Sequence, residues 1–210
     1  MIYEFCAENI TLIEQAMEAG AKRIELCDNL AVGGTTPSYG GIQTAVRLAK
    51  LYDSTVMTMI RPRGGNFVHT DLEIEIMLQD VHMARQAGSQ GLVFGLLTAD
   101  YRLDTVNLEK LIYAANGKEI VFHMAFDSIP VDQQFRAMDW LADHGVKRIL
   151  TRAGNPDTDL ERRFERYKEL IEAAQGRIEI LPGGGIGLSN RNLFMKQLGV
   201  DQLHGTKVVF

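Results

Sequence analysis

Short apolar runs alternate with longer amphipathic segments along the whole chain. The runs are rich in β-branched and aromatic residues, which favours strands, and they cover residues 2–7, 23–27, 55–60, 91–95, 119–124, 148–151, 178–181 and 202–205. The segments between them repeat apolar positions at helical spacing, and in one of them Thr70 and Glu73 are spaced to form a capping box. The pattern predicts eight strands and seven helices in strict alternation.

A faint internal repeat supports this order. The stretches "EAGAKRIEL", "QAGSQGLVF", "DHGVKRIL" and "QLGVDQLH" each place a glycine shortly before an apolar run, and they precede the second, fourth, sixth and eighth predicted strands. Glycine suits the left-handed position that ends a helix. Alternating strands and helices imply parallel strands, and eight of them favour a closed (β/α)₈ barrel over an open doubly wound sheet. We expect one domain over residues 1–210.

The end of the chain departs from a complete barrel. After the eighth predicted strand only "TKVVF" follows, so the eighth helix is missing. We therefore expect an apolar stripe on the outer wall to be uncovered. Large exposed apolar patches usually mark interfaces, so the sequence predicts an oligomer, most simply a two-fold dimer.

Composition narrows the function classes. The net charge of −5 gives no basic footprint for nucleic acid, and no apolar run approaches the roughly 20 residues that span a bilayer. The N-terminal "MIYEFCAENI" lacks the charged-then-apolar order of a signal peptide. Two cysteines, Cys6 and Cys27, do not make a disulfide framework. We expect a cytoplasmic protein with reduced thiols.

The predicted strand ends carry the candidate chemistry, because active sites of such barrels lie at the carboxyl ends of the strands. Side chains alternate along a strand, so Glu4 and Cys6 share one face, as do Glu25 and Cys27. If these faces point inward, buried carboxylates need a cation. We expect Arg61, at the end of the third strand, to neutralise them as a bidentate partner or to bind a ligand directly.

Two glycine-rich loops offer anion sites. Arg63 follows Pro62 and precedes Gly64 and Gly65, so we expect its side chain to be free to reach a ligand. The stretch "PGGGIGLSN" contains Gly183, Gly184 and Gly185, whose backbone N–H groups could bind a phosphate. A plain tight turn is the alternative interpretation there. Ser189 or Asn190 fits the N-cap of the helix that follows.

The remaining polar candidates are fewer. His123, at the end of the fifth strand, and Asp127 are placed for acid–base work together with Glu25, although a single histidine is more often simply hydrogen-bonded. We interpret His69, His82 and His144 as surface residues and Trp140 as a packing residue. The chain has no nucleophile elbow, Walker loop or HExxH motif.

A soft metal site is the other candidate. Cys6 and Cys27 end consecutive predicted strands, so their side chains should lie roughly 5 to 10 Å apart, given the strand spacing of about 4.8 Å. Two thiolates near Met57 or Met59 would suit Cu(I), whereas Zn(II) would lack its third and fourth ligands. The alternative is that both cysteines are buried as small apolar side chains.

The motifs resemble those of a known family. "KRIELCDNLAVGGTTPSYG", "IRPRGGNF", "GLVFGLLT", "FHMAFD", "RILT" and "LPGGGI", in this order, are similar to the CutC family of copper homeostasis proteins. The resemblance implies a cytoplasmic barrel, commonly dimeric, in which Cys6 and Cys27 match the proposed copper-binding cysteines. Two features depart from it: Met124 stands where the family usually has arginine, and relatives continue past the eighth strand.

Two functions from different classes remain open. The first is a copper homeostasis protein that binds Cu(I) through Cys6 and Cys27, without an organic cofactor. The second is a barrel enzyme for a small anionic or phosphorylated metabolite, held by Arg61, Arg63 and the 183–185 loop, with Glu25, His123 or Asp127 as acid–base groups. The first would take up Cu(I) through its thiols, and the second would bind an anion between the third and seventh strand loops. The sequence leaves open whether the chain is an enzyme.

Overall fold

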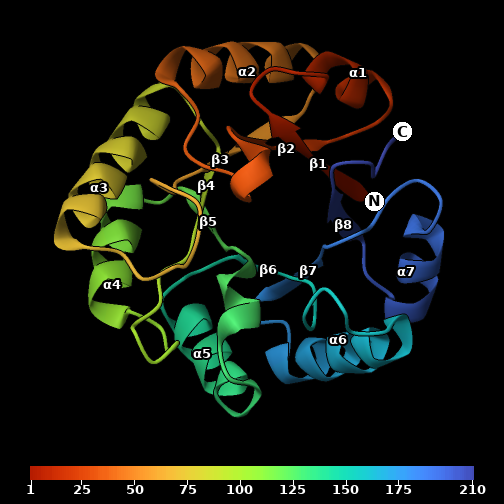
Figure 1. Cartoon of the computed structure of the whole chain (residues 1–210). Coiled ribbons are helices and arrows are strands. Elements are labelled where there is room, and N and C mark those ends of the chain that lie inside the picture. The colour runs from red at the N-terminus through yellow and green to blue at the C-terminus, as the bar shows by residue number, and fades with distance from the viewer.

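The computed structural model describes all 210 residues and forms a (β/α)₈-type barrel without an eighth helix. The eight parallel strands follow chain order around the ring, and β1 pairs with β8. β7 and β8 lie side by side and close the ring without a hydrogen-bonded ladder of their own. Figure 1 looks along the barrel, with the helices arranged around the strands. This ring excludes the open doubly wound sheet.

The elements match the predicted alternation of eight strands and seven helices. The strands are β1 Ile2–Glu8, β2 Arg23–Cys27, β3 Thr55–Met59, β4 Gly91–Phe94, β5 Glu119–Phe122, β6 Arg148–Thr151, β7 Glu179–Pro182 and β8 Gln202–Gly205. The helices are α1 Ile13–Glu18, α2 Tyr39–Leu51, α3 Asp71–Gln86, α4 Thr105–Ala115, α5 Val131–Asp143, α6 Leu160–Ala174 and α7 Arg191–Leu198, with short 3₁₀ turns η1 Leu30–Val32 and η2 Met124–Ser128. The capping box of Thr70 and Glu73 at the start of α3 is confirmed. No helix is long and apolar enough to cross a bilayer.

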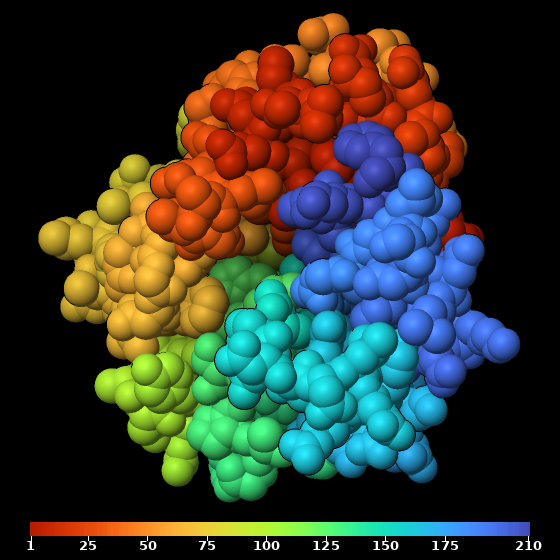
Figure 2. Space-filling view, turned by 45° about the vertical axis from the view of Figure 1, so that its right-hand side comes forward, coloured from red at the N-terminus to blue at the C-terminus, as the bar shows by residue number.

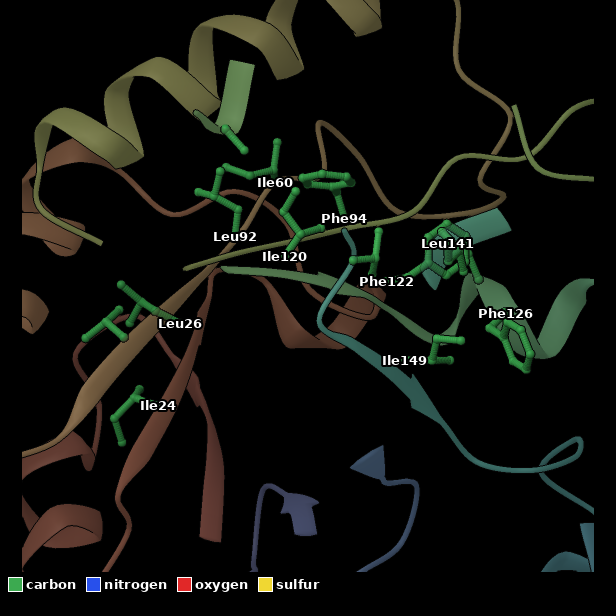
Figure 3. Close-up of a cluster of buried hydrophobic side chains, with 14 of the residues drawn as sticks. Ile24, Leu26, Ile60, Leu92, Phe94, Ile120, Phe122, Phe126, Leu141 and Ile149 are labelled. Carbon is green, nitrogen blue, oxygen red and sulfur yellow. The ribbon is translucent and has the colours of Figure 1, made fainter. Parts of the chain in front are cut away.

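The hydrophobic core has two layers that the strand alternation separates. Outward-facing strand residues such as Ile24, Leu92 and Phe122 pack under the helices, together with Phe126 and Leu141 (Figure 3). Inward-facing residues form a smaller cluster inside the barrel: Cys6, Cys27, Met57, Met59, Val93, Val121, Leu150 and Leu181. Both cysteines and both methionines therefore point inward, as the alternation predicted.

The C-terminal tail covers the outer wall at β1 and β8. Val208 and Val209 are buried, and the Phe210 ring lies 5.3 Å from the ring of Phe5, measured between centroids. Phe5 is consequently only 3% exposed, and Leu203 of β8 is fully buried. The expected uncovered stripe is therefore wrong at β1 and β8, because the residues after β8 pack over this part of the wall. The argument for a dimer loses that premise.

Candidate functional site

A buried ion network fills the barrel interior beneath the thiols. Glu4 forms a salt bridge with Arg23 of β2, and its Oε1 lies 2.8 Å from Nδ1 of His204 on β8. Arg23 also donates to Oε1 of Gln202 at 2.7 Å. Burial raises the pKa of Glu4, but Arg23 and His204 outweigh it and lower that pKa to about 2. Glu4 is therefore a carboxylate with its own cations.

A thiol–carboxylate cluster of Cys6, Cys27 and Glu25 lies directly above this network. Glu25 Oε2 is 3.2 Å from the Cys6 sulfur and 3.6 Å from the Cys27 sulfur. One ligand atom from each of the three lies within 4.8 Å of the others, and all three residues are buried. The two sulfurs are thus closer than the strand spacing alone predicted. The register places Cys6 opposite Glu25 and Cys27 opposite Glu8, so the two sulfurs approach each other diagonally across β1 and β2.

His204 supplies the positive charge for this cluster. Its Nε2 lies 3.8 Å from Glu25 Oε2. Burial lowers the pKa of His204, but Glu25, Cys6 and Glu4 outweigh that effect and raise the pKa well above its usual value. The contact with Cys27, together with His204, lowers the pKa of Cys6. Burial and the neighbouring Cys6 raise the pKa of Glu25. The contact with Cys6 also raises the pKa of Cys27. The three acidic groups therefore titrate together, and the His204 imidazolium lies beside them as the positive charge.

The cluster forms one side of a central pocket of about 330 Å³. Its polar lining comes from strand ends around the ring: Cys6, Glu25, Cys27, Arg61, His123 and His204. Leu30, Val32, Met59, Phe67 and Leu150 supply much of its apolar lining. Figure 2 shows a hollow bordered by orange, cyan and blue segments, with green atoms from the middle of the chain at its floor. The carboxyl ends of the strands therefore enclose a space of small-molecule size.

Arg61 does not pair with the buried acids, which corrects the sequence expectation. Arg23 and His204 neutralise Glu4 instead. The Arg61 guanidinium donates to the backbone carbonyls of Val32, Gly34 and Gly65 at 3.2, 3.1 and 2.7 Å. Arg61 therefore joins the loops after β2 and β3. It is 4% exposed and forms no salt bridge within the chain.

Arg63 is also bound rather than free. It forms a salt bridge with Glu73 of α3 and donates to the carbonyl oxygens of Gly64, Asn66 and Val68. The expectation of an unengaged loop cation is wrong, because the first turn of α3 supplies a carboxylate.

The two loop glycines serve packing and loop geometry. A Cβ on Gly64 would lie 2.6 Å from Cβ of Val32, so the loop approaches η1 too closely for a side chain. Gly65 has a φ of +83°, a conformation that favours glycine. Its carbonyl is the one that Arg61 binds at 2.7 Å.

His123 lies on the β5 side of the central pocket. Its Nδ1 accepts a hydrogen bond from the Ala125 N–H at 3.2 Å, and its buried Nε2 has no partner within the protein. Burial, reinforced by Arg61, lowers the pKa of His123 to about 3. His69 was expected at the surface, but its ring is fully buried, 3.7 Å from Glu73. His82 is exposed, as expected, and His144 is half-buried and stacks on Trp140.

Asp127 does not line the central pocket. One carboxylate oxygen accepts from the Thr151 hydroxyl at 2.5 Å, and the other accepts from the Arg152 N–H at 2.8 Å. Burial raises the pKa of Asp127 despite these bonds. Asp127 therefore ties η2 to the end of β6.

The glycine-rich loop after β7 borders a second, wider pocket of about 800 Å³, which also contains Met124 and His204. Gly184, Gly185, Arg152 and Lys207 line it, and no acidic residue does. Arg163 holds the loop by donating to the carbonyl oxygens of Gly183 and Gly184 at 2.9 and 2.8 Å. Asn190 precedes α7 at the N-cap position, but its side chain bonds to Gly185 and Gly187 instead of capping the helix.

Sequence reasoning gave no role to Arg23 or to His204. Both residues are central here. The signal for Arg23 was its place two residues before Glu25, on the same strand face. His204 meets Glu4 across 200 residues of sequence, and only closure of the ring brings them together.

The fold and this site define a (β/α)₈ barrel protein with a buried thiol–carboxylate centre at the carboxyl ends of β1 and β2. The chain belongs to the CutC family, whose model matches residues 1–209. It is 53% identical to a CutC family protein of Enterococcus faecalis and 48% identical to one of Streptococcus pyogenes, each aligned over 209 residues and the full length of both chains. The crystal structure of a CutC protein from Streptococcus agalactiae superposes with a TM-score of 0.95 at 44% identity and covers 99% of both chains.

The comparisons refine two further expectations. Other CutC relatives are longer, as expected: the alignment covers 81% of the protein from Pasteurella multocida. The relatives from Enterococcus faecalis and Streptococcus pyogenes show that the shorter barrel also occurs in the family. An aldolase superposes with a TM-score of 0.72 at 16% identity, which shows a shared fold alone.

Proposed function

We propose that this chain is a copper homeostasis protein that binds Cu(I) through Cys6 and Cys27. The observation that carries the proposal is the meeting of both sulfurs and a Glu25 oxygen within 4.8 Å in a buried cluster. Thiolates are soft donors that suit Cu(I). The CutC protein from Streptococcus agalactiae is connected by its name with copper homeostasis, which agrees with this assignment.

The charges of the cluster favour a monovalent ion. Metal binding requires deprotonated thiols, and the His204 imidazolium beside the cluster favours its anionic form. Any thiol proton that Cu(I) displaces would pass to water, and two thiolates with one Cu(I) carry a net charge of about −1, which His204 balances. A divalent zinc ion would add a second positive charge beside the His204 imidazolium and find only two thiolates and one carboxylate.

Competitive titration tests the assignment. Wild type, Cys6→Ser and Cys27→Ser would be titrated under reducing, oxygen-free conditions against a chromogenic Cu(I) chelator, with Zn(II) in a parallel series. We expect each serine variant to weaken Cu(I) binding by at least about tenfold, since even the loss of groups behind a ligand costs that much. Equal affinity in all three proteins would contradict the proposal. Tighter binding of Zn(II) than of Cu(I) would contradict the choice of metal.

The same proposal includes a cytoplasmic location and a homodimer. Both follow from the family resemblance, and free, closely spaced thiols agree with a reducing compartment. The dimer no longer depends on an uncovered wall. Light scattering at micromolar protein tests it, and a monomer of 23.4 kDa would contradict it.

A second candidate is a barrel enzyme for a small anionic metabolite. The favouring observation is the wide pocket beside the β7 loop, where Arg152 and Lys207 form no ion pair with an acidic side chain. Barrels often hold phosphate at this position. Glu25 and His123 would be its acid–base groups in the central pocket, and Asp127 would orient the β6 end. A thermal-stability screen of small anions tests it, since a ligand that binds only the native state raises stability. No stabilisation by any anion would contradict it.

A further inference from the structure

The central pocket contains polar atoms that the chain itself does not satisfy. Glu25 Oε1, Arg61 Nε and His123 Nε2 are buried and have no hydrogen-bond partner within the protein. All three residues line the pocket and are at most 4% exposed. Buried polar atoms are normally paired, so three in one pocket indicate a ligand whose polar atoms complement them.

Arg61 brings a buried positive charge without a carboxylate partner. Three of its five N–H groups donate to backbone carbonyls, and Nε is the one guanidinium nitrogen without any partner. The carbon of the guanidinium lies 4.9 Å from the centre of the Phe67 ring, which stacks beside it. A buried unpaired charge is costly, and an anion in the pocket would compensate it.

His123 provides a second donor next to the same ring. The centre of its imidazole ring lies 4.9 Å from the centre of the Phe67 ring. Arg61 and His123 therefore both pack against Phe67. Because Nδ1 accepts from the Ala125 N–H, the proton of the neutral ring is on Nε2. Arg61 and His123 therefore both line the pocket beside Phe67, and each has a buried nitrogen without a partner.

We propose that the central pocket binds a small organic carboxylate, whose two oxygens accept from Arg61 Nε–H and His123 Nε2–H. Its short apolar body would pack on Leu30, Val32, Met59 and Leu150. The proposal goes beyond the second candidate function, because it places a carboxylate in the central pocket, whereas that candidate places its anion at the β7 loop. Neither donor is a thiol, although Cys6 and Cys27 line the same pocket.

The donor set favours a carboxylate over a phosphate. The two unpartnered nitrogens, Arg61 Nε and His123 Nε2, match the two oxygens of a planar monoanion, whereas a phosphate dianion presents more oxygens and twice the charge. The thiol–carboxylate cluster on the other side of the pocket carries negative charge and would repel the dianion. The volume of about 330 Å³ lies at the lower end of ligand pockets and suits a compound of a few carbons.

Butyrate, its neutral isostere butyramide and inorganic phosphate are the probes. The His123 Nε2–H signal of ¹⁵N-histidine-labelled protein and the melting temperature would be followed in wild type and in His123→Asn. Asparagine keeps a side-chain acceptor for the Ala125 N–H but removes the Nε2 donor. His82→Asn, on the exposed face of α3, is the matched control, and Arg61→Lys is a second variant that retains the charge.

We expect butyrate to shift the His123 signal and raise the melting temperature of wild type and His82→Asn, while butyramide does neither. His123→Asn should bind butyrate about tenfold more weakly, because a hydrogen bond to a charged group is lost. An equal response to butyramide, or undiminished butyrate binding by His123→Asn, would overturn the proposal. Stabilisation by phosphate alone would also overturn it, while leaving the second candidate function standing with its anion at the β7 loop.

Discussion

His123 should make the protein acid-sensitive, and replacing it should remove that sensitivity. The imidazole is fully enclosed by the loops after β3 and β5, and burial with nearby Arg61 lowers its pKa from 6.5 to about 3. The folded state therefore prefers the neutral ring. For a base with a lowered folded pKa, this contribution to stability is fully present above pH 6.5. It is lost as the pH falls from 6.5 toward 3.

The magnitude follows from the two pKa values. At pH 4.5 the unfolded histidine is protonated and the folded one is still neutral, and this pH lies two units below the unfolded pKa. Each unit corresponds to about 1.4 kcal/mol, so the free energy of unfolding should fall by about 3 kcal/mol from this residue between pH 7.5 and pH 4.5. The result changes little if the folded pKa is a unit higher, since the ring is then still mostly neutral at pH 4.5.

Urea unfolding of wild type and His123→Asn at both pH values measures this contribution. Other groups titrate alike in both proteins, so the difference between the two pH-dependent losses isolates His123. We expect wild type to lose about 3 kcal/mol more than the variant. Parallel losses in the two proteins would show that the ring is already charged, or reached by water, in the folded state.

Three further predictions concern the residues that hold the site together. Arg63→Ala should lower the free energy of unfolding by about 2 kcal/mol, because it breaks a salt bridge to Glu73 and three hydrogen bonds to carbonyls. This figure is reduced for solvent screening, since the side chain is 38% exposed. A change below about 0.5 kcal/mol in urea unfolding would show that these contacts do not stabilise the fold. Tyr167→Phe should lower the free energy of unfolding by about 1 to 2 kcal/mol, since the buried Tyr167 hydroxyl donates to carbonyls at the ends of β6 and β7. Unchanged stability in calorimetry would show that these hydrogen bonds do not hold the two strand ends together. Phe210→Ala should lower the free energy of unfolding by about 1 kcal/mol and increase binding of a hydrophobic dye, because it uncovers the ring of Phe5. Unchanged dye binding would show that the residues after β8 do not cover the barrel wall.

Much of the fold could be predicted from local sequence patterns, because the spacing of apolar residues within about a dozen residues indicates each strand or helix. The inward faces of Cys6, Glu25 and Met59 followed from alternation alone. The register between strands was not available, and it decides which inward residues touch. The register of β1 and β2 places Cys6 opposite Glu25, which explains why the Glu25 carboxylate lies within reach of both sulfurs.

The partners of buried charges were the least predictable part of the site. Glu4 is paired with Arg23 from the next strand and with His204 from the last one, and neither contact is local in sequence. Arg61 appeared to be the natural cation, but backbone carbonyls of two loops occupy it. Loop carbonyls leave no signature in a residue pattern, so sequence reasoning assigns such arginines to carboxylates or ligands instead.

X-ray absorption at the copper edge of protein loaded with one equivalent of Cu(I) tests the central claim most directly. The cluster predicts scattering from two sulfur atoms, because Cys6 and Cys27 lie within reach of one ion. Serine at either position should reduce the sulfur count by one. A spectrum with only nitrogen and oxygen neighbours, or one unchanged by both substitutions, would contradict copper binding at this site.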